Sequence, residues 1–336
     1  MAREDTTVRN IKLIFLGSAS LIAMSAIHAP AHACLTLTAI GIADGFTLST
    51  FAITDPANVG TFNGGPFGVT VVGGNVLVSD SAQSTLLVFN DVDGQTPASA
   101  VFTRSFNSSV AAFATSGGAA YGSDGIGNFV QFNADSSINH ILTGVKARPT
   151  LGIATAPNGH LIASSTLGLI DIDPTASGGA GKSRVINANV SADGVSVSID
   201  GTQAIVESGS SIQIYDIATG TLLKTLLSSA NPDGTGVING GTFNGDIVAN
   251  TNNGNIDLID PTTNTFVTIA NGGSRGDYTT PDPNGTLLLD QSEGIYRLGI
   301  KGGTIGGGTP VPEPASLSLL AMAVVGLGVL RRHLKI

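Results

Sequence analysis

A two-residue turn recurs through the chain at a nearly fixed interval. Six pairs occupy the repeated position: Gly73-Gly74, Gly117-Gly118, Asn158-Gly159, Asp200-Gly201, Asn244-Gly245 and Asn284-Gly285. Their second glycines lie 44, 41, 42, 44 and 40 residues apart. Gly-Gly, Asn-Gly and Asp-Gly suit the positive φ angles that both central residues of a type I′ hairpin require. The spacing therefore predicts six β-hairpins, one in each of six repeated units.

Short apolar or alternating runs flank each turn, and further runs of the same kind follow it in most units. In the fourth unit, residues 194–208 surround the turn, and residues 211–217 and 222–227 come after it. Four short strands in about 42 residues are typical of one blade of a β-propeller. A β-sandwich or β-solenoid does not readily explain this period. The sequence predicts an all-β, six-bladed propeller over residues 34–303.

The sixth unit lacks a fourth strand-like segment. After Gly294–Ile300 the chain becomes rich in glycine, and residues 304–311 are predicted to be a linker. The segment Phe46–Thr54, which precedes the first unit, can supply the missing outer strand. Such closure removes the exposed sheet edges that an exported β protein must avoid. We therefore expect Phe46–Thr54 to pair with the blade that contains Leu287–Leu298.

The N-terminal end carries the features of a secretory signal peptide. Basic residues precede an apolar run over residues 13–27, and this run leads to Ala31-His32-Ala33. A charged start, an apolar middle and an A-x-A exit predict that residues 1–33 are removed by signal peptidase. An uncleaved membrane anchor is the alternative interpretation.

Cys34 is then the first residue of the mature chain and its only cysteine. An internal disulfide is therefore excluded, although the destination is oxidising. A cysteine at this position also raises the alternative of a lipoprotein. Ala31 and His32 stand where a lipobox has an aliphatic and a small residue, so the sequence favours an unmodified Cys34.

The C-terminal end has three ordered parts. Pro312-Glu313-Pro314 comes first, a charge-free stretch covers residues 315–330, and Arg331-Arg332 follows. The prolines hold the first part extended. As a helix the stretch is about 24 Å long, slightly shorter than the roughly 30 Å hydrocarbon core of a bilayer. Its basic end favours the cytoplasmic side. The sequence predicts a membrane-spanning tail over residues 315–330.

As a set, these parts over residues 312–336 resemble the PEP-CTERM sorting signal of Gram-negative bacteria. The resemblance implies recognition by an exosortase, a membrane-embedded enzyme that cuts near the motif and releases or transfers the protein. It implies an inner-membrane intermediate with the propeller outside the cytoplasm, and then the cell surface or the extracellular space. PEP-CTERM proteins accompany exopolysaccharide production, so exopolysaccharide or envelope partners in a biofilm matrix are also implied.

Between the two terminal signals, residues 34–311 hold 9 basic and 21 acidic side chains, a net charge near −12. Such a surface repels nucleic acid, and no basic patch with interleaved aromatic residues occurs. The two histidines of this region, His140 and His160, match no triad or metal-ligand spacing. The sequence therefore indicates neither nucleic-acid binding nor a zinc site.

The repeats are similar to the NHL/YVTN/SMP-30 group of propellers, on lines such as DGVSVSIDGTQAIVES (193–208) and NIDLIDPTTNTF (255–266). In SMP-30-like lactonases a glutamate near the start, an asparagine and an aspartate surround one divalent ion. Here the only glutamates of the body are Glu207 and Glu293, and neither lies in the first unit. Gly65-Pro66 stands where that family has a Glu-Gly-Pro motif. We therefore expect no enzyme, no cofactor and no catalytic residue.

Acidic or polar residues recur six positions after the second glycine of most turns, near the predicted end of each second strand. The acidic members are Asp80, Asp124, Glu207 and Asp290, the last displaced by one position. A rim of carboxylates offers the oxygen ligands that Ca²⁺ takes, and single carboxylates predict weak binding at several places rather than an assigned metal site. The alternative is that these residues only stabilise turns.

Together these features predict an exported binding or interaction module of the cell surface or extracellular matrix. The alternative is a secreted, metal-dependent hydrolase like SMP-30 and gluconolactonase. An enzyme of that kind needs polar ligands from several blades that converge on the axial channel.

Overall fold

The computed structural model describes residues 35–58, 65–106 and 112–307. The predicted signal peptide, with Ala31, Ala33 and Cys34 at its predicted cleavage site, lies outside these ranges. So do Pro312, Glu313, Pro314, Arg331, Arg332 and the predicted span 315–330. Within the described ranges, no helix has the length and apolarity that crossing a bilayer demands.

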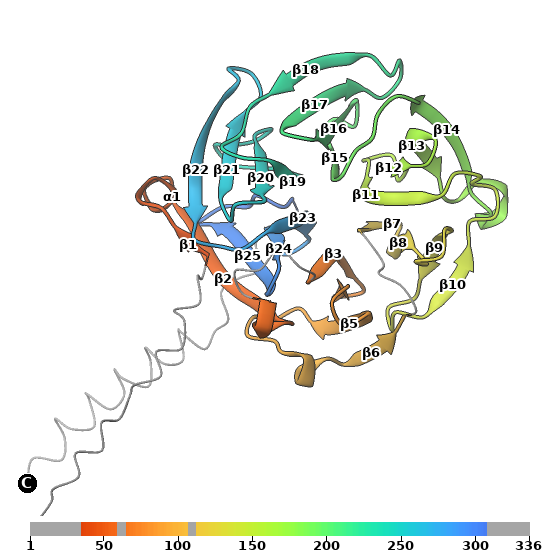
Figure 1. Cartoon of the computed structure of the whole chain (residues 1–336), viewed down its shortest axis with the longest axis horizontal. Coiled ribbons are helices and arrows are strands. Elements are labelled where there is room, and N and C mark those ends of the chain that lie inside the picture. The colour runs from red at the N-terminus through yellow and green to blue at the C-terminus, as the bar shows by residue number, and fades with distance from the viewer. Residues whose placement is uncertain (1–34, 59–64, 107–111, 308–336) are drawn as a thin grey trace, which may run out of the picture. The chain divides into compact units, whose positions relative to one another are not determined.

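Six antiparallel sheets surround a central axis, and each sheet is one blade (Figure 1). In the first five blades the strands follow one another from the axis outward. Blade 1 contains β3 (Pro66–Val72), β4 (Asn75–Asp80), β5 (Thr85–Asn90) and β6 (Phe102–Ser105). Blade 2 contains β7 (Phe113–Ser116), β8 (Ala119–Ser123), β9 (Phe129–Phe132) and β10 (Ile138–Ile141). Blade 3 contains β11 (Pro149–Thr155), β12 (Leu161–Ser165), β13 (Gly168–Asp173) and β14 (Lys182–Asn187).

The remaining blades follow the same plan. Blade 4 contains β15 (Val195–Val197), β16 (Gln203–Ser208), β17 (Ser211–Asp216) and β18 (Leu222–Leu226). Blade 5 contains β19 (Pro232–Val237), β20 (Ile247–Thr251), β21 (Ile256–Asp260) and β22 (Thr265–Asn271). Blade 6 contains β23 (Gly276–Asp282), β24 (Thr286–Gln291), β25 (Gly294–Ile300) and, as its outer strand, β2 (Phe46–Ile53). All six predicted turns join the first strand of a blade to its second, so the all-β, six-bladed fold is confirmed.

The ring is closed by the pairing that the sequence predicts. β2 runs antiparallel to β25, with Phe46 opposite Ile300 and Ile53 opposite Gly294. One short strand was not predicted: β1 (Thr36–Leu37) adds a fifth strand to blade 5 by pairing with the end of β22. The helix α1 (Ala39–Ala43) then carries the chain from β1 to β2. Two residues and one helical turn are too short to leave a periodic signal in the sequence.

An arginine cluster reinforces the seam between blades 6 and 1. Arg297 of β25 forms ion pairs with Asp91 and Asp93, which follow β5, and with Asp282 of β23. Its guanidinium also lies 5.2 Å from the centre of the Phe51 ring in β2. One cation therefore joins the last blade, the first blade and the closing strand.

The hairpin turns are of two kinds, which corrects the type I′ prediction. Gly73-Gly74 and Gly117-Gly118 have positive φ at both residues, as a two-residue type I′ turn requires. In the other four turns only the glycine has positive φ. The loop over 156–160 shows the reason: Gly159 N donates to Ala156 O at 2.8 Å, which forms a type I turn before the left-handed glycine. Longer loops leave the Asn or Asp in ordinary geometry, where Asn158 Oδ1 accepts from His160 N at 3.0 Å.

The core lies between neighbouring blades rather than in one central layer. Phe113 of β7 packs edge-on against Phe132 of β9 at 5.3 Å, and Leu77 and Val88 of blade 1 complete the same buried cluster. Similar clusters fill the other gaps between blades. The inner strands surround the axis, so the channel along it is the place where side chains from all six blades can meet.

Candidate functional site: the axial channel and its two mouths

The propeller has two faces, and the channel opens toward both. The hairpin-turn face carries the six turns between first and second strands. The opposite face carries the starts of the six inner strands and the ends of the second strands. This arrangement follows from the antiparallel order of every blade.

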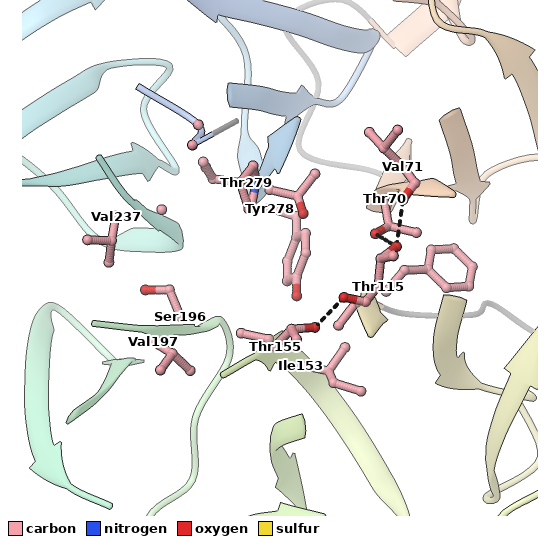
Figure 2. Close-up of a pocket in the computed structure, with 18 of the residues that line it drawn as sticks. Thr70, Val71, Thr115, Ile153, Thr155, Ser196, Val197, Val237, Tyr278 and Thr279 are labelled. Carbon is pink, nitrogen blue, oxygen red and sulfur yellow. Dashed lines mark hydrogen bonds between the residues drawn. The ribbon is translucent and has the colours of Figure 1, made fainter. Parts of the chain in front are cut away.

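At the hairpin-turn face the channel widens to a cavity of about 440 Å³. Residues from all six inner strands line it, and Figure 2 shows them converging from different blades. The labelled ones are Thr70, Val71, Thr115, Ile153, Thr155, Ser196, Val197, Val237, Tyr278 and Thr279. The described lining residues carry no charge. The cavity thus combines aliphatic surface with hydroxyl groups.

The hydroxyl groups tie neighbouring inner strands together (Figure 2). Thr115 Oγ1 donates to Val71 O at 2.7 Å, so Thr70 Oγ1 is the donor in its 2.8 Å bond to Thr115 Oγ1. Thr155 Oγ1 donates to Thr115 O at 2.8 Å. On the other side of the channel, the adjacent inner strands β15 and β19 are linked in the same way, since Ser196 Oγ lies 2.8 Å from Thr235 Oγ1. These bonds give hydrogen-bond partners to hydroxyl and carbonyl groups that lose their contact with water when the ring closes.

One lining hydroxyl has no protein partner. Thr279 is only 4 % exposed, and its Oγ1 makes no hydrogen bond. A buried hydroxyl without a partner carries a desolvation cost of about 1–3 kcal/mol. This oxygen has almost no accessible surface, so a ligand in the channel can remove that cost only after the Thr279 side chain rotates its Oγ1 toward the channel.

Tyr278 lies between the wide cavity and the opposite mouth, because it lines both the channel and a small cavity of about 80 Å³. Its ring stands near Ile153 on the far side of the channel (Figure 2). Burial raises the pKa of its hydroxyl. The two mouths are therefore chemically separate.

The opposite mouth is charged. Arg275 Nη2 lies 2.8 Å from Asp233 Oδ2 and 2.5 Å from Asp277 Oδ1, and its guanidinium lies over the Phe67 ring at 5.4 Å. Asp193 lines the same small cavity. Burial, together with neighbouring Asp233, raises the pKa of Asp193 to about 7. Three blades thus bring carboxylates to one arginine.

Sequence reasoning missed this cluster, although a signal for it exists. Asp193, Asp233 and Asp277 lie 40 and 44 residues apart, which is the same period as the turns. Each stands at or just before the start of an inner strand. Arg275 breaks the pattern, because it belongs to the loop before β23 and pairs with Asp233 of the preceding blade.

The four acids predicted as a rim do stand at or beside the ends of second strands, but they are not on an exposed rim. Asp80 and Glu207 are 1 % exposed, Asp290 is fully buried and Asp124 is 7 % exposed. Second strands lie one layer out from the axis, and nearby backbone covers their ends: the following turn covers Asp124, and the start of β23 covers Asp290. Weak calcium binding by these acids stays a prediction, and among the described residues no group of three or more His, Cys, Asp or Glu could hold a metal.

Three of these acids accept backbone hydrogen bonds. Asp124 Oδ1 accepts from the N–H groups of residues 126, 127 and 128 at 2.8–3.0 Å. Asp290 Oδ1 accepts from the N–H of Asp277 at 3.1 Å and from that of Tyr278. Asp80 Oδ1 accepts from Gln83 N at 3.1 Å. The contacts of Asp80 and Asp124 match the turn-stabilising alternative, whereas Asp290 holds the start of the neighbouring strand β23.

Glu207 differs from the other three. Neither of its carboxylate oxygens has a hydrogen-bond partner. Burial raises its pKa to about 8, and the nearby carboxylates of Asp233 and Asp193 act in the same direction. Glu207 is therefore largely protonated at neutral pH.

Other side chains weighed in the sequence have local partners. His140 Nε2 lies 2.9 Å from Gly179 O, and His160 Nδ1 lies 2.7 Å from Asp171 Oδ1. Ser274 Oγ donates to the buried carboxylate of Glu293. The channel lining includes none of these groups.

Two different comparisons with known proteins bear on this chain: one matches the sequence of its tail, and the other matches the fold of its propeller. Residues 310–332 match the PEP-CTERM protein-sorting motif. No curated protein sequence matches the chain. Among solved structures, the WD40 β-propeller domain of Doa1 has a TM-score of 0.50 at 13 % identity, with 71 % of this chain and 79 % of that one covered.

Two further structures are similar at the same level. Streptogramin B lyase has a TM-score of 0.49 at 14 % identity, with 76 % of this chain and 98 % of that one covered. The extracellular domain of BT4673 from B. thetaiotaomicron has a TM-score of 0.48 at 14 % identity, with 69 % of this chain covered. This chain spans about a third (32 %) of the BT4673 chain. The protein therefore carries a six-bladed β-propeller followed by a PEP-CTERM protein-sorting motif.

Proposed function

We propose that this protein is an exported binding module, processed by an exosortase, whose axial channel takes a neutral, hydroxyl-bearing ligand of the cell surface or matrix. The sorting motif implies exosortase-dependent export. The channel supports the binding role. A sugar unit of a neutral exopolysaccharide has the chemistry that this channel suits.

The observation that carries the proposal is the uncharged lining with one unpartnered hydroxyl. A volume of about 440 Å³ falls within the range of small-molecule sites, which are mostly apolar with a few placed polar groups. Thr279 lines the cavity and supplies such a polar group when its side chain rotates the buried Oγ1 toward the channel. An anionic ligand is disfavoured, because the body carries a net charge near −12.

Calorimetry on the released protein tests this proposal, with neutral and anionic exopolysaccharide fractions as the two ligands. We expect binding to the neutral fraction only. Thr279→Val keeps the shape and removes the hydroxyl, so it should weaken binding roughly five-fold, the value of one hydrogen bond of about 1 kcal/mol. The matched control is Thr103→Val on the exposed outer strand β6, which should leave affinity unchanged. Equal affinities for all three proteins, or no binding to the neutral fraction, would overturn the channel as the site.

A hydrolase is the second candidate, and the opposite mouth is the observation that favours it. Carboxylates of Asp193, Asp233 and Asp277 converge there from three blades. Because Arg275 already forms ion pairs with Asp233 and Asp277, we propose a structural role for the cluster. Lactone turnover that is lost in Asp193→Asn, with an unchanged melting temperature, would favour the enzyme instead.

A further inference from the structure

The chain leaves the propeller at the mouth of the wide cavity. After β25 ends at Ile300, residues 301–307 turn inward across the hairpin-turn face. Ile305 is fully buried, its N–H donates to Gly285 O at 2.8 Å, and its carbonyl accepts from Asn239 N at 2.8 Å. Gly307 N donates to Asn239 O at 3.2 Å. The first four residues of the predicted linker 304–311 are therefore part of the fold, held between the turns of blades 5 and 6.

The last described residues therefore lie at the mouth of the channel. Gly306 and Gly307 themselves line the wide cavity. Only seven residues, 308–314, separate Gly307 from the predicted span that begins at Ala315. Seven residues reach at most about 25 Å when fully extended. A propeller tethered by this tail is consequently held with its channel mouth close to the bilayer.

The other end of the described chain lies on the opposite face. Thr36 of β1 pairs with Asn271, the last residue of β22. Outer strands run from the hairpin-turn face to the opposite face, so Asn271 lies at the opposite face. The two ends of the described chain, Thr36 and Gly307, therefore lie at different faces, so a tether that continues from Gly307 sets which face the membrane meets.

We propose that the tethered precursor holds its hairpin-turn face toward the membrane, so that polymer-sized ligands reach the channel only after the tail has been removed. This inference rests on the proposed function, since it assigns a ligand to the channel and a cutting step to the tail. Aspartates such as Asp173, Asp216 and Asp260 end third strands on the same face. Their charge disfavours tight adhesion to an anionic bilayer, so the short tether, rather than membrane binding, keeps the mouth shielded.

Cysteine labelling in spheroplasts of a strain without exosortase tests the geometry. Cys34→Ala removes the only cysteine of the mature sequence. Val197→Cys then places one thiol in the channel, and Ile126→Cys places one on the opposite face, where Ile126 is 74 % exposed. Each variant is made with the natural tether and with about 20 Gly/Ser residues inserted after Gly307, which raises the mean span of the tether to roughly 30 Å. The probe is a bulky, membrane-impermeant maleimide-polyethylene glycol.

We expect Val197→Cys to react several-fold more slowly with the natural tether than with the long one, and Ile126→Cys to react equally in both. N-ethylmaleimide should label both variants at either length, which shows that the thiols are reactive. If Val197→Cys is inert even to this small reagent, Ile199→Cys at the same mouth replaces it. Equal polymer labelling at both tether lengths would overturn the inference.

These outcomes are separable from failure of the proposed function. The labelling comparison requires neither exosortase cutting nor a ligand. The mass of the mature C-terminus reports cutting, and calorimetry on the released protein reports binding.

Discussion

At the residue scale, ionisable side chains are the part of this molecule that sequence patterns describe least well. The recurrence of Asp80, Asp124, Glu207 and Asp290 could be seen in the sequence, but their burial could not. A repeat period fixes the position of a residue along its blade, whereas burial depends on which loops and strand ends lie over it. The Arg275 and Arg297 clusters were missed because each joins residues from different blades.

Glu207 gives a pH-dependent prediction. Its folded pKa of about 8 exceeds that of an unfolded glutamate, so the folded state holds the extra proton between about pH 4.5 and pH 8. The stability from this group is complete below that window and is lost as the pH rises through it, by about 1.4 kcal/mol per pKa unit at most. Glu207→Gln should flatten the decline and be more stable than the natural protein at pH 8.

Urea unfolding at pH values from 5 to 8 measures this effect. Asp200→Asn is the control, because hydrogen bonds from Ser198 and Thr202 lower the pKa of Asp200 and it titrates outside the window. A natural protein whose free energy of unfolding is constant from pH 5 to 8 would contradict the assignment to Glu207.

Arg297 gives a second prediction at this scale. Its side chain is mostly buried, and Arg297→Ala leaves the fully buried Asp282 without its ion-pair partner. Breaking a buried pair costs about 3–5 kcal/mol, so a loss of about 3 kcal/mol in the free energy of unfolding is expected. Arg184→Ala, which breaks the more exposed pair with Asp171, should cost less than about 1 kcal/mol. Similar losses in urea unfolding for both variants would show that Arg297 does not hold the seam.

At the scale of elements, the repeat predicted the strands, the hairpin positions and the closing partner of the last blade. These features are local or periodic, so residues 46–54 and the six turns suffice to find them. Turn type was predicted correctly only where the loop has two residues. Loops of three or more residues contain similar Asn-Gly or Asp-Gly pairs, and loop length is set by where the flanking strands start to pair. β1 was missed because two residues carry no pattern.

Removal of the closing strand gives the prediction at this scale. Deletion of residues 35–54 removes β2, including the fully buried Phe46 and Phe51, and exposes the edge of β25. Losing two buried phenylalanines costs roughly 6 kcal/mol or more, which corresponds to a fall of roughly 15 °C in Tm for a domain of this size. Deletion of residues 35–38 alone removes only β1 and should lower Tm by a few degrees. Calorimetry that gives equal Tm values for the two deletions would refute closure as a source of stability.

At the scale of the whole molecule, the sorting signals predict how the protein is cut. The mature form should start at Cys34 and lack residues 315–336. Replacing Glu313 by alanine, or both Pro312 and Pro314, should leave a longer form in the membrane, because the enzyme needs the extended motif at the bilayer edge. Mass spectrometry of both termini from native cells measures this. An intact C-terminus in cells that contain an exosortase would contradict it.

The antiparallel pairing of β2 with β25 also has a consequence for the order of events during export. It joins residues 241 to 254 positions apart, since Ile53 faces Gly294 and Phe46 faces Ile300. Such long-range pairing forms late, because loop closure over the whole chain must come first. When a chain crosses the membrane from its N-terminus, β2 emerges long before β25. Its backbone N–H and C=O groups stay unpaired until β25 has also crossed. The ring can therefore close only when translocation has nearly reached the tail. Pulse-chase proteolysis of precursors truncated after Gly276 and after Gly307 should therefore find resistance only in the longer one.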